Sequence, residues 1–597
     1  MIDVDYEPLP AVIGAKAAAT NKTQLHDDVP GNMSYEWPLG DKAAVQAALD
    51  SSDHVIELDL INQRLIPNAM EPRACVAQWN KYTEEMTLWT TSQNPHPIRL
   101  LLSAYTLGIP ENRLRVISPD VGGGFGSKIF HYPEEIIVPW VSRKIERPVK
   151  WVATRSEASM TDSQGRDHVT HAKLGVKNDG TITALHVETY ADHGAYISTF
   201  APLIPTAFYH CLLSGLYKIP VIYGVTFATM TNTVPVDAYR GAGRPEAAYL
   251  VERIADLAAR KLKMDPVAFR RKNFVGKDEF PYQTAVVMQY DSGDYNKLFD
   301  EALRLSNYGD LIKRRDAARA AGKVAGVGIA GCIEASGPAP SKIAGALGSA
   351  VGFWESAVMR VHPTGKVSLL TGSHSHGQGH ETAFAQVVAD ELGIPMKDIE
   401  IIHGDTSKVP FGMGSYGSRS LSVGGSAIVK SAEKVREKMK KIAAHQLEAA
   451  VEDIVYDQEV GKMYVKGSPD KSKSVFDVSL ASYTAHNLPD GLEPGMEETS
   501  FYDPSNFTFP NSCHIAYVEV DKDTGEVKID KYFAVDDVGN VVNPMIVDGQ
   551  IAGGIVQGVG QALLEEGVYD ENGQLISGSF LEYAMPRAHH LDRKSVV

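Results

Sequence analysis

Short hydrophobic segments bounded by polar residues and glycines recur along the first third of the chain. Their β-branched and aromatic content is typical of strands. The predicted strands cover residues 74–79, 88–92, 115–118, 149–153 and 185–190. Residues 244–263 differ, because their apolar side chains repeat at helical spacing up to Asp265-Pro266, a sequence typical of a helix end. The pattern predicts a chain that mixes strands and helices.

Three further pairs of hydrophobic segments are each joined by a short polar turn that contains glycine, as in a β-hairpin. The paired segments are residues 173–176 and 182–185, 357–362 and 367–371, and 516–520 and 527–530. Because the pairs resemble one another, we expect a hairpin unit to recur in two related α+β domains. Helices are predicted at residues 381–392, 425–448 and 553–565, and strand-like segments at residues 2–10 and 578–583.

Length and composition indicate a globular protein with several domains. A chain of 597 residues is too long for one hydrophobic core, and a domain boundary is expected near the charged, alanine-rich stretch 311–323. The formal net charge of -16 argues against nonspecific binding to nucleic acid. No apolar stretch approaches the ~20 residues of a membrane span, and no signal sequence is apparent. We therefore expect a cytoplasmic protein without a transmembrane segment.

The cysteines and histidines allow one metal-binding alternative. Four cysteines, widely separated in the sequence, form no CxxC metal site and no local iron–sulfur cluster. His374, His376 and His380 lie at close spacing, and neutral imidazole is a good zinc ligand. A zinc-binding protein is thus an alternative, although two of these histidines flank glycines in a predicted loop and no fourth ligand is apparent.

Four glycine-rich turns are spread along the chain, at residues 122–126, 241–244, 377–380 and 414–419. Runs of glycine occur where the backbone takes positive φ or approaches a neighbour too closely for a Cβ atom. None of the four fits a phosphate-binding P-loop or a dinucleotide fingerprint. Taken together, they predict one large polyanionic ligand held by backbone amides from several sides.

With their flanking residues, these turns resemble the molybdenum-binding large subunit of the xanthine dehydrogenase, aldehyde oxidase and aerobic carbon monoxide dehydrogenase family. The matching motifs follow the family's order along nearly the whole chain. They are LWTTSQNPH at 88–96, VGGGFGSK at 121–128, AYRGAGRPE at 238–246, GQGHET at 377–382, DDVGNVVNP at 536–544 and GIVQGVG at 554–560.

The resemblance implies an α+β fold. It comprises two related molybdopterin-binding domains of mixed sheets and helices, preceded by the remnant of an α/β hammerhead domain. We expect residues 1–20 to form the tail of the hammerhead domain, residues 21–310 the first molybdopterin-binding domain and residues 311–597 the second. Both ends of the chain are expected to be truncated.

The resemblance also implies a molybdopterin cofactor, in its cytosine dinucleotide form, whose molybdenum takes no protein ligand. Gln93 is expected to hydrogen-bond an oxygen ligand of the metal, Phe125 and Gly126 to pack close to it, and Arg240 to line the substrate side. Backbone amides at helix starts suit a pyrophosphate. The residues expected to hold the pterin and its tail are Gly124, Gly377, Gln378, Gly379, His380, Ser418, Arg419, Ser420, Gln550 and Gln557.

The implied reaction is hydroxylation of a small molecule with water as the oxygen source. Gly241 stands where the carbon monoxide dehydrogenases carry a copper-binding cysteine, and Ile129 where the purine oxidisers carry a glutamate. An aldehyde or an N-heterocycle remains as substrate. The family's catalytic glutamate loop is expected beyond Val597, and neither Glu565 nor Glu566 is proposed as the base. A catalytically incomplete fragment is therefore a second alternative.

Electron transfer away from the metal requires carriers that four scattered cysteines do not supply. The resemblance implies two partner subunits, one with [2Fe-2S] clusters and one with FAD, in a dimer of heterotrimers.

Overall fold

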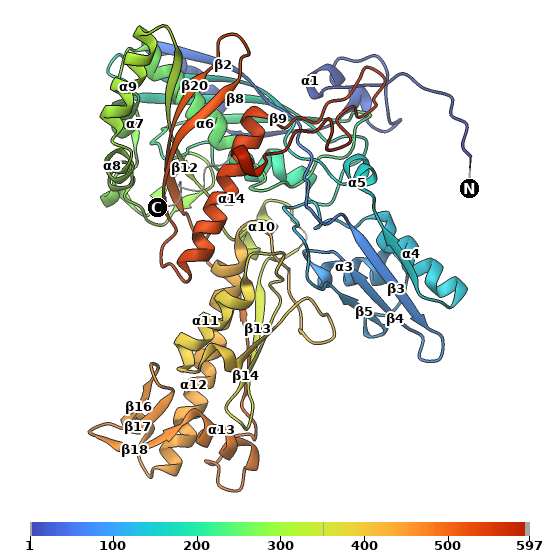
Figure 1. The fold of residues 1–597 in the computed structure, drawn as a ribbon, viewed down its shortest axis with the longest axis vertical. Coiled ribbons are helices and arrows are strands. Elements are labelled where there is room, and N and C mark those ends of the chain that lie inside the picture. Colours follow the sequence, from blue (N-terminus) through green and yellow to red (C-terminus); the bar gives the residue numbers. More distant parts are fainter. Residues whose placement is uncertain (1–2, 339, 350, 591–597) are drawn as a thin grey trace.

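Two packed sheets form one end of the molecule (Figure 1). The computed structural model describes residues 3–338, 340–349 and 351–590. The five-stranded sheet has the order β1 (Met33–Gly40), β9 (Ile222–Thr229), β8 (Ile182–Asp192), β7 (His168–Val176), β2 (His54–Asn62). The three-stranded sheet has the order β12 (Val324–Ile333), β20 (Asn511–Val520), β21 (Val527–Asp537).

Helix α6 (Arg244–Lys261) fills the main core between these sheets. It contacts β2 and β7 in one sheet and β12 in the other. Its buried side chains, among them Leu250, Ile254 and Ala258, recur every four residues, as the sequence pattern predicts. The same core includes residues on both sides of position 311. The domain limits therefore stay a prediction.

Two smaller sheets repeat one topology. The first has the order β5 (Leu114–Ile117), β4 (Glu85–Thr90), β3 (Ala74–Asn80), β6 (Val149–Val152). The second has the order β15 (Ile399–Ile402), β14 (Val367–Thr371), β13 (Glu355–Val361), β19 (Glu497–Tyr502). The pairs β4–β5 and β14–β15 are parallel, and the other pairs in both sheets are antiparallel.

The helices that follow these strands also correspond. A strand–loop–helix–strand unit runs from β4 through α3 (Pro95–Leu101) to β5, and again from β14 through α11 (His380–Leu392) to β15. A second helix follows in each unit. It is α4 (Pro133–Ile145), which comes directly before β6, and α12 (Ser426–Gln446), which comes earlier in the chain than β19. The structure thus repeats an α+β unit that includes the predicted hairpin 357–371, whereas the predicted hairpins at 173–185 and 516–530 lie in the two larger sheets.

All three predicted hairpins are present, as β7–β8, β13–β14 and β20–β21. Their turns contain Gly180, Gly365 and Gly525 at φ values of 88°, 78° and 77°, which explains why glycine occupies them. The predicted strands 74–79, 88–92, 115–118, 149–153 and 185–190 correspond to β3, β4, β5, β6 and part of β8.

Three predicted elements are wrong in part or in whole. Residues 3–10 have no regular secondary structure, and residue 2 lies outside the described residues. Residues 578–583 form turns, because no neighbouring strand offers backbone partners there. Helix α14 (Pro544–Leu563) begins nine residues before the predicted start at 553, where the Asn543 side chain accepts a hydrogen bond from the Ile546 amide. An Asn-Pro pair is a helix start signal. None of the described helices is both long and apolar enough to span a membrane.

Candidate functional site

The candidate site lies where the two repeated units meet. At this contact the guanidinium of Arg115, on β5, donates to both carboxylate oxygens of Asp405, which follows β15, at 3.0 and 2.6 Å. A loop follows the carboxyl end of the central parallel strand in each unit, residues 91–94 after β4 and 372–379 after β14. Ligands commonly bind outside the carboxyl ends of parallel strands. The meeting of two such loops identifies a candidate ligand site.

Gln93 is enclosed by glycines from two distant turns. Its Oε1 accepts a hydrogen bond from the Gly126 amide at 2.9 Å, and its Nε2 donates to the Ser415 carbonyl at 2.9 Å. A Cβ atom on Gly124 would lie 2.5 Å from Gln93 Oε1, and one on Gly414 would lie 2.2 Å from the Gln93 carbonyl oxygen. These glycines therefore make room for Gln93. An amide nitrogen carries two hydrogens, so a second N–H of Gln93 remains for a ligand.

Phe125 and Arg240 lie side by side. The Arg240 amide donates to the Phe125 carbonyl at 2.8 Å, and the guanidinium carbon lies 5.5 Å from the centre of the Phe125 ring. Phe125 has φ of 54° and remains 43% exposed, an unusual conformation for an aromatic residue. Gly126 has φ of 110°, and a Cβ atom there would lie 2.3 Å from the Ala238 carbonyl oxygen. Burial lowers the pKa of Arg240.

Helix α14 connects this region to the loop after β14. A Cβ atom on Gly379 would lie 3.0 Å from Ile546 Cδ1, and one on Gly553 would lie 3.1 Å from Arg240 Nη2. The spacing of i, i+4, i+7 and i+11 puts four residues on one helix face. They are Ile546, Gln550, Gly553 and Gln557. The predicted binding residues Gln550 and Gln557 therefore lie on the face that meets the site.

The loop before α11 has the predicted form. Gly379 precedes the helix with φ of 76°, and Gly377 has φ of 103° with no atom near its Cβ position. Gln378 turns back into the loop, because its Oε1 accepts from the His376 amide and its Nε2 donates to His376 Nδ1 at 3.0 Å. Its side chain thus shapes the loop, which leaves the backbone amides at the helix start for a ligand.

The three histidines of this loop are buried and neutral. Burial lowers the pKa of His376 to about 3 and that of His380 to about 4, and it lowers the pKa of His374 still more clearly. Neighbouring imidazoles add to each shift. Within the described part of the chain, no group of three or more His, Cys, Asp or Glu side chains is placed to hold a metal ion. The zinc alternative therefore lacks the geometry it requires.

Arg419 is fully buried and bound to the protein itself. Its Nη1 donates to Glu355 Oε2 at 2.7 Å and to the Gly414 carbonyl, and its Nη2 donates to the carbonyls of Phe353 and Trp354. A guanidinium used in this way holds a loop rather than a phosphate. The sequence offered no signal for this pairing, because Glu355 lies 64 residues away at the start of β13.

The remaining residues of this loop differ in exposure. Ser418 is exposed with φ of 57°, whereas the Ser420 hydroxyl lies 2.8 Å from that of Ser415. Ser415, which sequence reasoning missed, contacts Gln93 through its carbonyl and its amide. Its hydroxyl and the Ser420 hydroxyl each keep hydrogen-bonding capacity toward a ligand.

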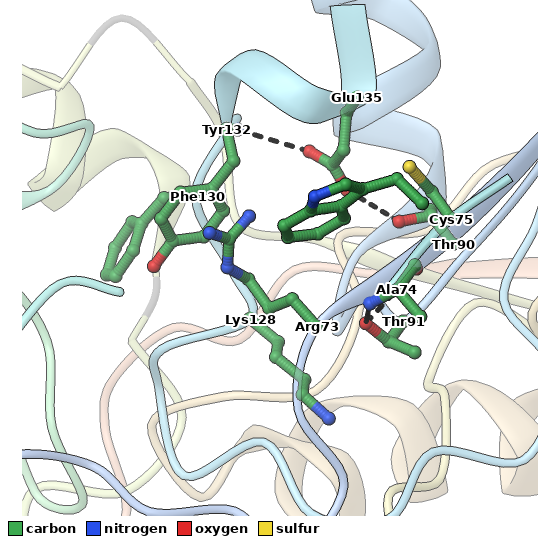
Figure 2. Close-up of a pocket in the computed structure, with 10 residues that line it drawn as sticks. Arg73, Ala74, Cys75, Thr90, Thr91, Lys128, Phe130, Tyr132 and Glu135 are labelled. Atoms are coloured by element: carbon green, nitrogen blue, oxygen red, sulfur yellow. Dashed lines mark hydrogen bonds between the residues drawn. The ribbon is translucent and has the colours of Figure 1, made fainter. Parts of the chain in front are cut away.

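A separate small cavity is lined by Arg73, Lys128, Tyr132 and Glu135, among other residues (Figure 2). Its volume is about 10 Å³, room for about one water molecule. The Arg73 guanidinium carbon lies 3.6 Å from the centre of the Tyr132 ring, and Glu135 accepts hydrogen bonds from the Thr90 hydroxyl and the Tyr132 amide. This cavity is part of the packing of the first unit and is too small for a substrate.

Glu565 lies just beyond the end of α14, and burial raises its pKa to about 7. Its Oε1 approaches the Cβ position of Gly560 to 3.0 Å. The structure gives it no contact with Gln93 or Phe125 among the hydrogen bonds of the described residues. It therefore stays without a catalytic assignment.

Comparison with known proteins identifies two domains in this chain. Two family models described as "molybdopterin cofactor-binding domain" match residues 25–274 and 301–591. The carbon monoxide dehydrogenase large chain of Hydrogenophaga pseudoflava is 38% identical over 98% of this chain and 74% of the relative. The nicotine 6-hydroxylase large subunit of Paenarthrobacter nicotinovorans is 34% identical over 98% and 71%. The crystal structure of quinoline 2-oxidoreductase from Pseudomonas putida 86 superposes with a TM-score of 0.94 at 36% identity, covering 98% of this chain and 74% of that one.

Proposed function

Because this chain belongs to the molybdenum hydroxylase large-subunit family, we propose that it hydroxylates an aldehyde or an N-heterocycle at the site around Gln93. Family membership makes the protein a molybdopterin-dependent oxidoreductase subunit. The observation that carries the proposed site is the enclosure of Gln93 by Gly124 and Gly126 from one turn and by Gly414 from another.

The residues around Gln93 fit a molybdopterin. The molybdenum supplies the two-electron oxidation that hydroxylation by water requires. On the protein side, the second N–H of Gln93 can donate to an oxygen ligand of the metal. The amides at the start of α11, beside Gly377 and Gly379, suit the phosphates of the cofactor tail. The hydroxyls of Ser415 and Ser420 add further donors.

Phe125 and Arg240 would form the substrate side of the site. The exposed ring of Phe125 gives a flat apolar surface on which an aromatic or aliphatic substrate can pack. The Arg240 guanidinium lies against that ring and supplies hydrogen-bond donors at its edge. Together these groups would orient a small molecule that has an apolar body and one polar atom, as aldehydes and N-heterocycles have.

Carbon monoxide is a poor candidate substrate because a cysteine cannot replace Gly241 without strain. Gly241 has φ of 91°, and a Cβ atom there would lie 2.4 Å from Pro245 Cγ. A copper-binding thiolate at this position would need a different backbone. Ile129 is buried against Ala238 and Ala242, directly behind the loop that carries Arg240. An apolar residue at this point favours an apolar substrate body over a polar purine.

The cofactor form and the partners extend the same proposal. We infer a cytosine dinucleotide, whose longer tail would use Gln550 and Gln557 on α14 as well as the loops. Several relatives are named as subunits or chains of larger enzymes, including the gamma subunit of a 6-hydroxypseudooxynicotine dehydrogenase complex. Electrons would pass to an iron–sulfur subunit and a FAD subunit, in a dimer of heterotrimers.

Turnover by the loaded complex tests this function. The chain is produced with its partner subunits, its molybdenum and pterin contents are measured, and aldehydes, N-heterocycles and carbon monoxide are offered in turn. We expect oxidation of at least one aldehyde or N-heterocycle and none of carbon monoxide. Gln93→Ala should lower turnover roughly 10²–10³-fold, the scale for one preorganised donor, whereas Gln46→Ala on an exposed helix should not change it. Oxidation of carbon monoxide, or full activity in Gln93→Ala, would contradict the proposal.

A further inference from the structure

Three side chains connect the surface to the interior behind the loop that precedes α11. The Glu381 carboxylate, 50% exposed, has its Oε1 2.9 Å from His403 Nε2. His403 is 11% exposed, and its Nδ1 lies 3.1 Å from Nδ1 of His374, which is completely buried. The chain of contacts thus runs from a solvated carboxylate through two imidazoles to a buried ring.

The repeated unit explains how these residues meet. His374 follows β14, His403 follows β15, and Glu381 lies in the first turn of α11. Because β14 and β15 are parallel neighbours, their carboxyl ends meet at one edge, and the start of α11 lies at the same edge. The corresponding place in the first unit is the loop that carries Gln93.

The geometry determines which nitrogen carries each proton. An ionised carboxylate only accepts hydrogen bonds, so His403 must donate from Nε2, and in the neutral ring Nδ1 is then an acceptor. His374 must then donate from Nδ1 to His403 Nδ1. Nε2 of His374 is left as a bare acceptor, and it has no hydrogen-bond partner among the described residues. A buried acceptor of this kind is rare in proteins.

The inner end of this chain adjoins the site. The rings of His374 and His376 pack edge to face with centres 5.1 Å apart. Burial lowers the pKa of His376, and the nearby Gln93 carbonyl raises it in part. His376 therefore lies beside both His374 and the residue around which the proposed site is built.

Hydroxylation by water releases protons that must leave the site, and these three side chains offer a route for them. Conversion of R–H and H₂O into R–OH releases two protons and two electrons. The electrons leave through the proposed iron–sulfur and FAD carriers, and the protons must leave a buried site. We propose that His374, His403 and Glu381 form a proton relay that carries protons from the site to solvent. This proposal rests on the proposed function.

The relay passes one proton at a time, and the number of protons on its three groups is the same before and after each passage. His374 Nε2 accepts a proton from the site while its Nδ1 proton passes to His403 Nδ1. The Nε2 proton of His403 then passes to Glu381 Oε1, which releases it to water. Each imidazole ends with its proton on the other nitrogen, and each ring must then exchange that proton with water before it can carry the next one. One proton enters and one leaves, and no group is oxidised or reduced.

The surroundings favour a neutral His374 between transfers. Burial and then His376 and His403 lower the pKa of His374, and the hydrogen bond from His403 lowers the pKa of Glu381 to about 2. The charged and titratable groups that face His374 are His376, His380, His403 and Glu381. A relay needs groups that take up a proton only briefly, and a buried imidazole of low pKa such as His374 behaves in this way.

The tautomers can be observed without any activity. The full chain is labelled with ¹⁵N-histidine, and the imidazole nitrogens of His374 and His403 are assigned from their loss in His374→Gln and His403→Gln. We expect protonated Nδ1 and bare Nε2 in His374, and protonated Nε2 and bare Nδ1 in His403. A proton on Nε2 of His374 would overturn the relay.

Kinetics of the loaded complex provide the second test. Glutamine at position 403 keeps polar contacts but cannot accept and release a proton between two nitrogens. His403→Gln should lower kcat about tenfold, below the ~10²–10⁴-fold scale of direct acid–base catalysis. KM should not change, the solvent deuterium isotope effect should rise, and added imidazole should restore turnover. Glu381→Gln, at a half-exposed position, should cause a smaller loss of kcat. This second variant keeps the relay testable if His403→Gln does not fold.

The matched control is His171→Gln. His171 pairs with the exposed carboxylate of Asp59 at 2.9 Å, on strands β7 and β2, and its loss should leave kcat and the isotope effect unchanged. Wild-type kcat with an unchanged isotope effect in both His403→Gln and Glu381→Gln would refute the relay. Failure of the wild-type complex to oxidise any aldehyde or heterocycle would instead refute the proposed function, because the tautomers are measured independently.

Discussion

Substitution of Gly124 by alanine tests whether glycine at this position makes room for Gln93. The new Cβ atom would lie 2.5 Å from Oε1, 2.6 Å from Cδ and 2.8 Å from Cγ of Gln93. Overpacking of this kind costs ~1–3 kcal/mol, and the two hydrogen bonds of the Gln93 amide contribute ~1 kcal/mol each. If the Gln93 side chain moves away from the new methyl group, it relieves the overlap but loses its hydrogen bonds. The two costs are therefore not fully additive, and we expect a local destabilisation of ~2–4 kcal/mol.

Hydrogen exchange at single amides measures this effect locally, which suits a chain whose global unfolding need not be two-state. The reporters are the amides of Gly126 and Ser415, which donate to Gln93 Oε1 and to the Gln93 carbonyl. At ~1.4 kcal/mol per factor of ten, their exchange should accelerate by about 30-fold to about 700-fold. Gly558→Ala on α14 is the control, because no atom lies within 4 Å of its Cβ position; it should leave both amides unchanged.

A double mutant separates overlap with Gln93 from other effects of the methyl group. In the Gln93→Ala background the three overlapping atoms are gone, so Gly124→Ala should change Ser415 exchange by no more than ~0.5 kcal/mol, the usual limit for uncoupled sites. If Gly124→Ala is equally costly in both backgrounds, its cost does not come from Gln93, and the reasoning about this glycine fails.

Three further predictions concern the surrounding structure. Arg419→Ala should lower stability by ~3–5 kcal/mol because it leaves Glu355 buried without its partner, whereas Arg115→Ala at a partly exposed pair should cost no more than ~1 kcal/mol in the same urea titration. Stability should fall as pH drops from about 6.5 towards 3, because the unfolded chain protonates His376 and His380 while the folded chain keeps them neutral. Replacement of His376 by Asn should flatten the dependence of Tm on pH, and an unchanged slope would contradict this explanation. Gly241→Cys should lower Tm through strain at φ of 91° worth ~1–3 kcal/mol, and Gly309→Cys, where no atom lies near the Cβ position, should not.

Local sequence signals predicted much of the fold because they act over a few residues. Turn glycines at 180, 365 and 525 fixed the three hairpins, and helical spacing after Gly243 located α6. The strand predicted at 578–583 failed because a strand also needs a neighbour, which a local pattern does not supply. The early start of α14 was missed because its glycines and polar residues weaken the apolar pattern, although Asn543-Pro544 marks the start.

The site was less predictable because its contacts join residues far apart in the chain. Motif order pointed to Gln93 and to the glycine turns, and the structure brings these together. The partners of those residues carry no such signal. Ser415 lies 322 residues from Gln93, and Glu355 and Arg419 are 64 residues apart. The reason for glycine at 124 and 414 also differs from the expectation, because space for a glutamine rather than for a phosphate requires it.

The two repeated units touch along a seam that several hydrogen bonds cross, among them those of Arg115 with Asp405 and of Gln93 with Ser415. A ligand that contacts both units stabilises their contact, since it binds fully only when the two units are together. We expect such a ligand to insert before the two units close, or through a transient opening between them. Maturation of the protein would then be a mechanical event as well as a chemical one, and the empty chain would be the form most open to proteolysis along this line.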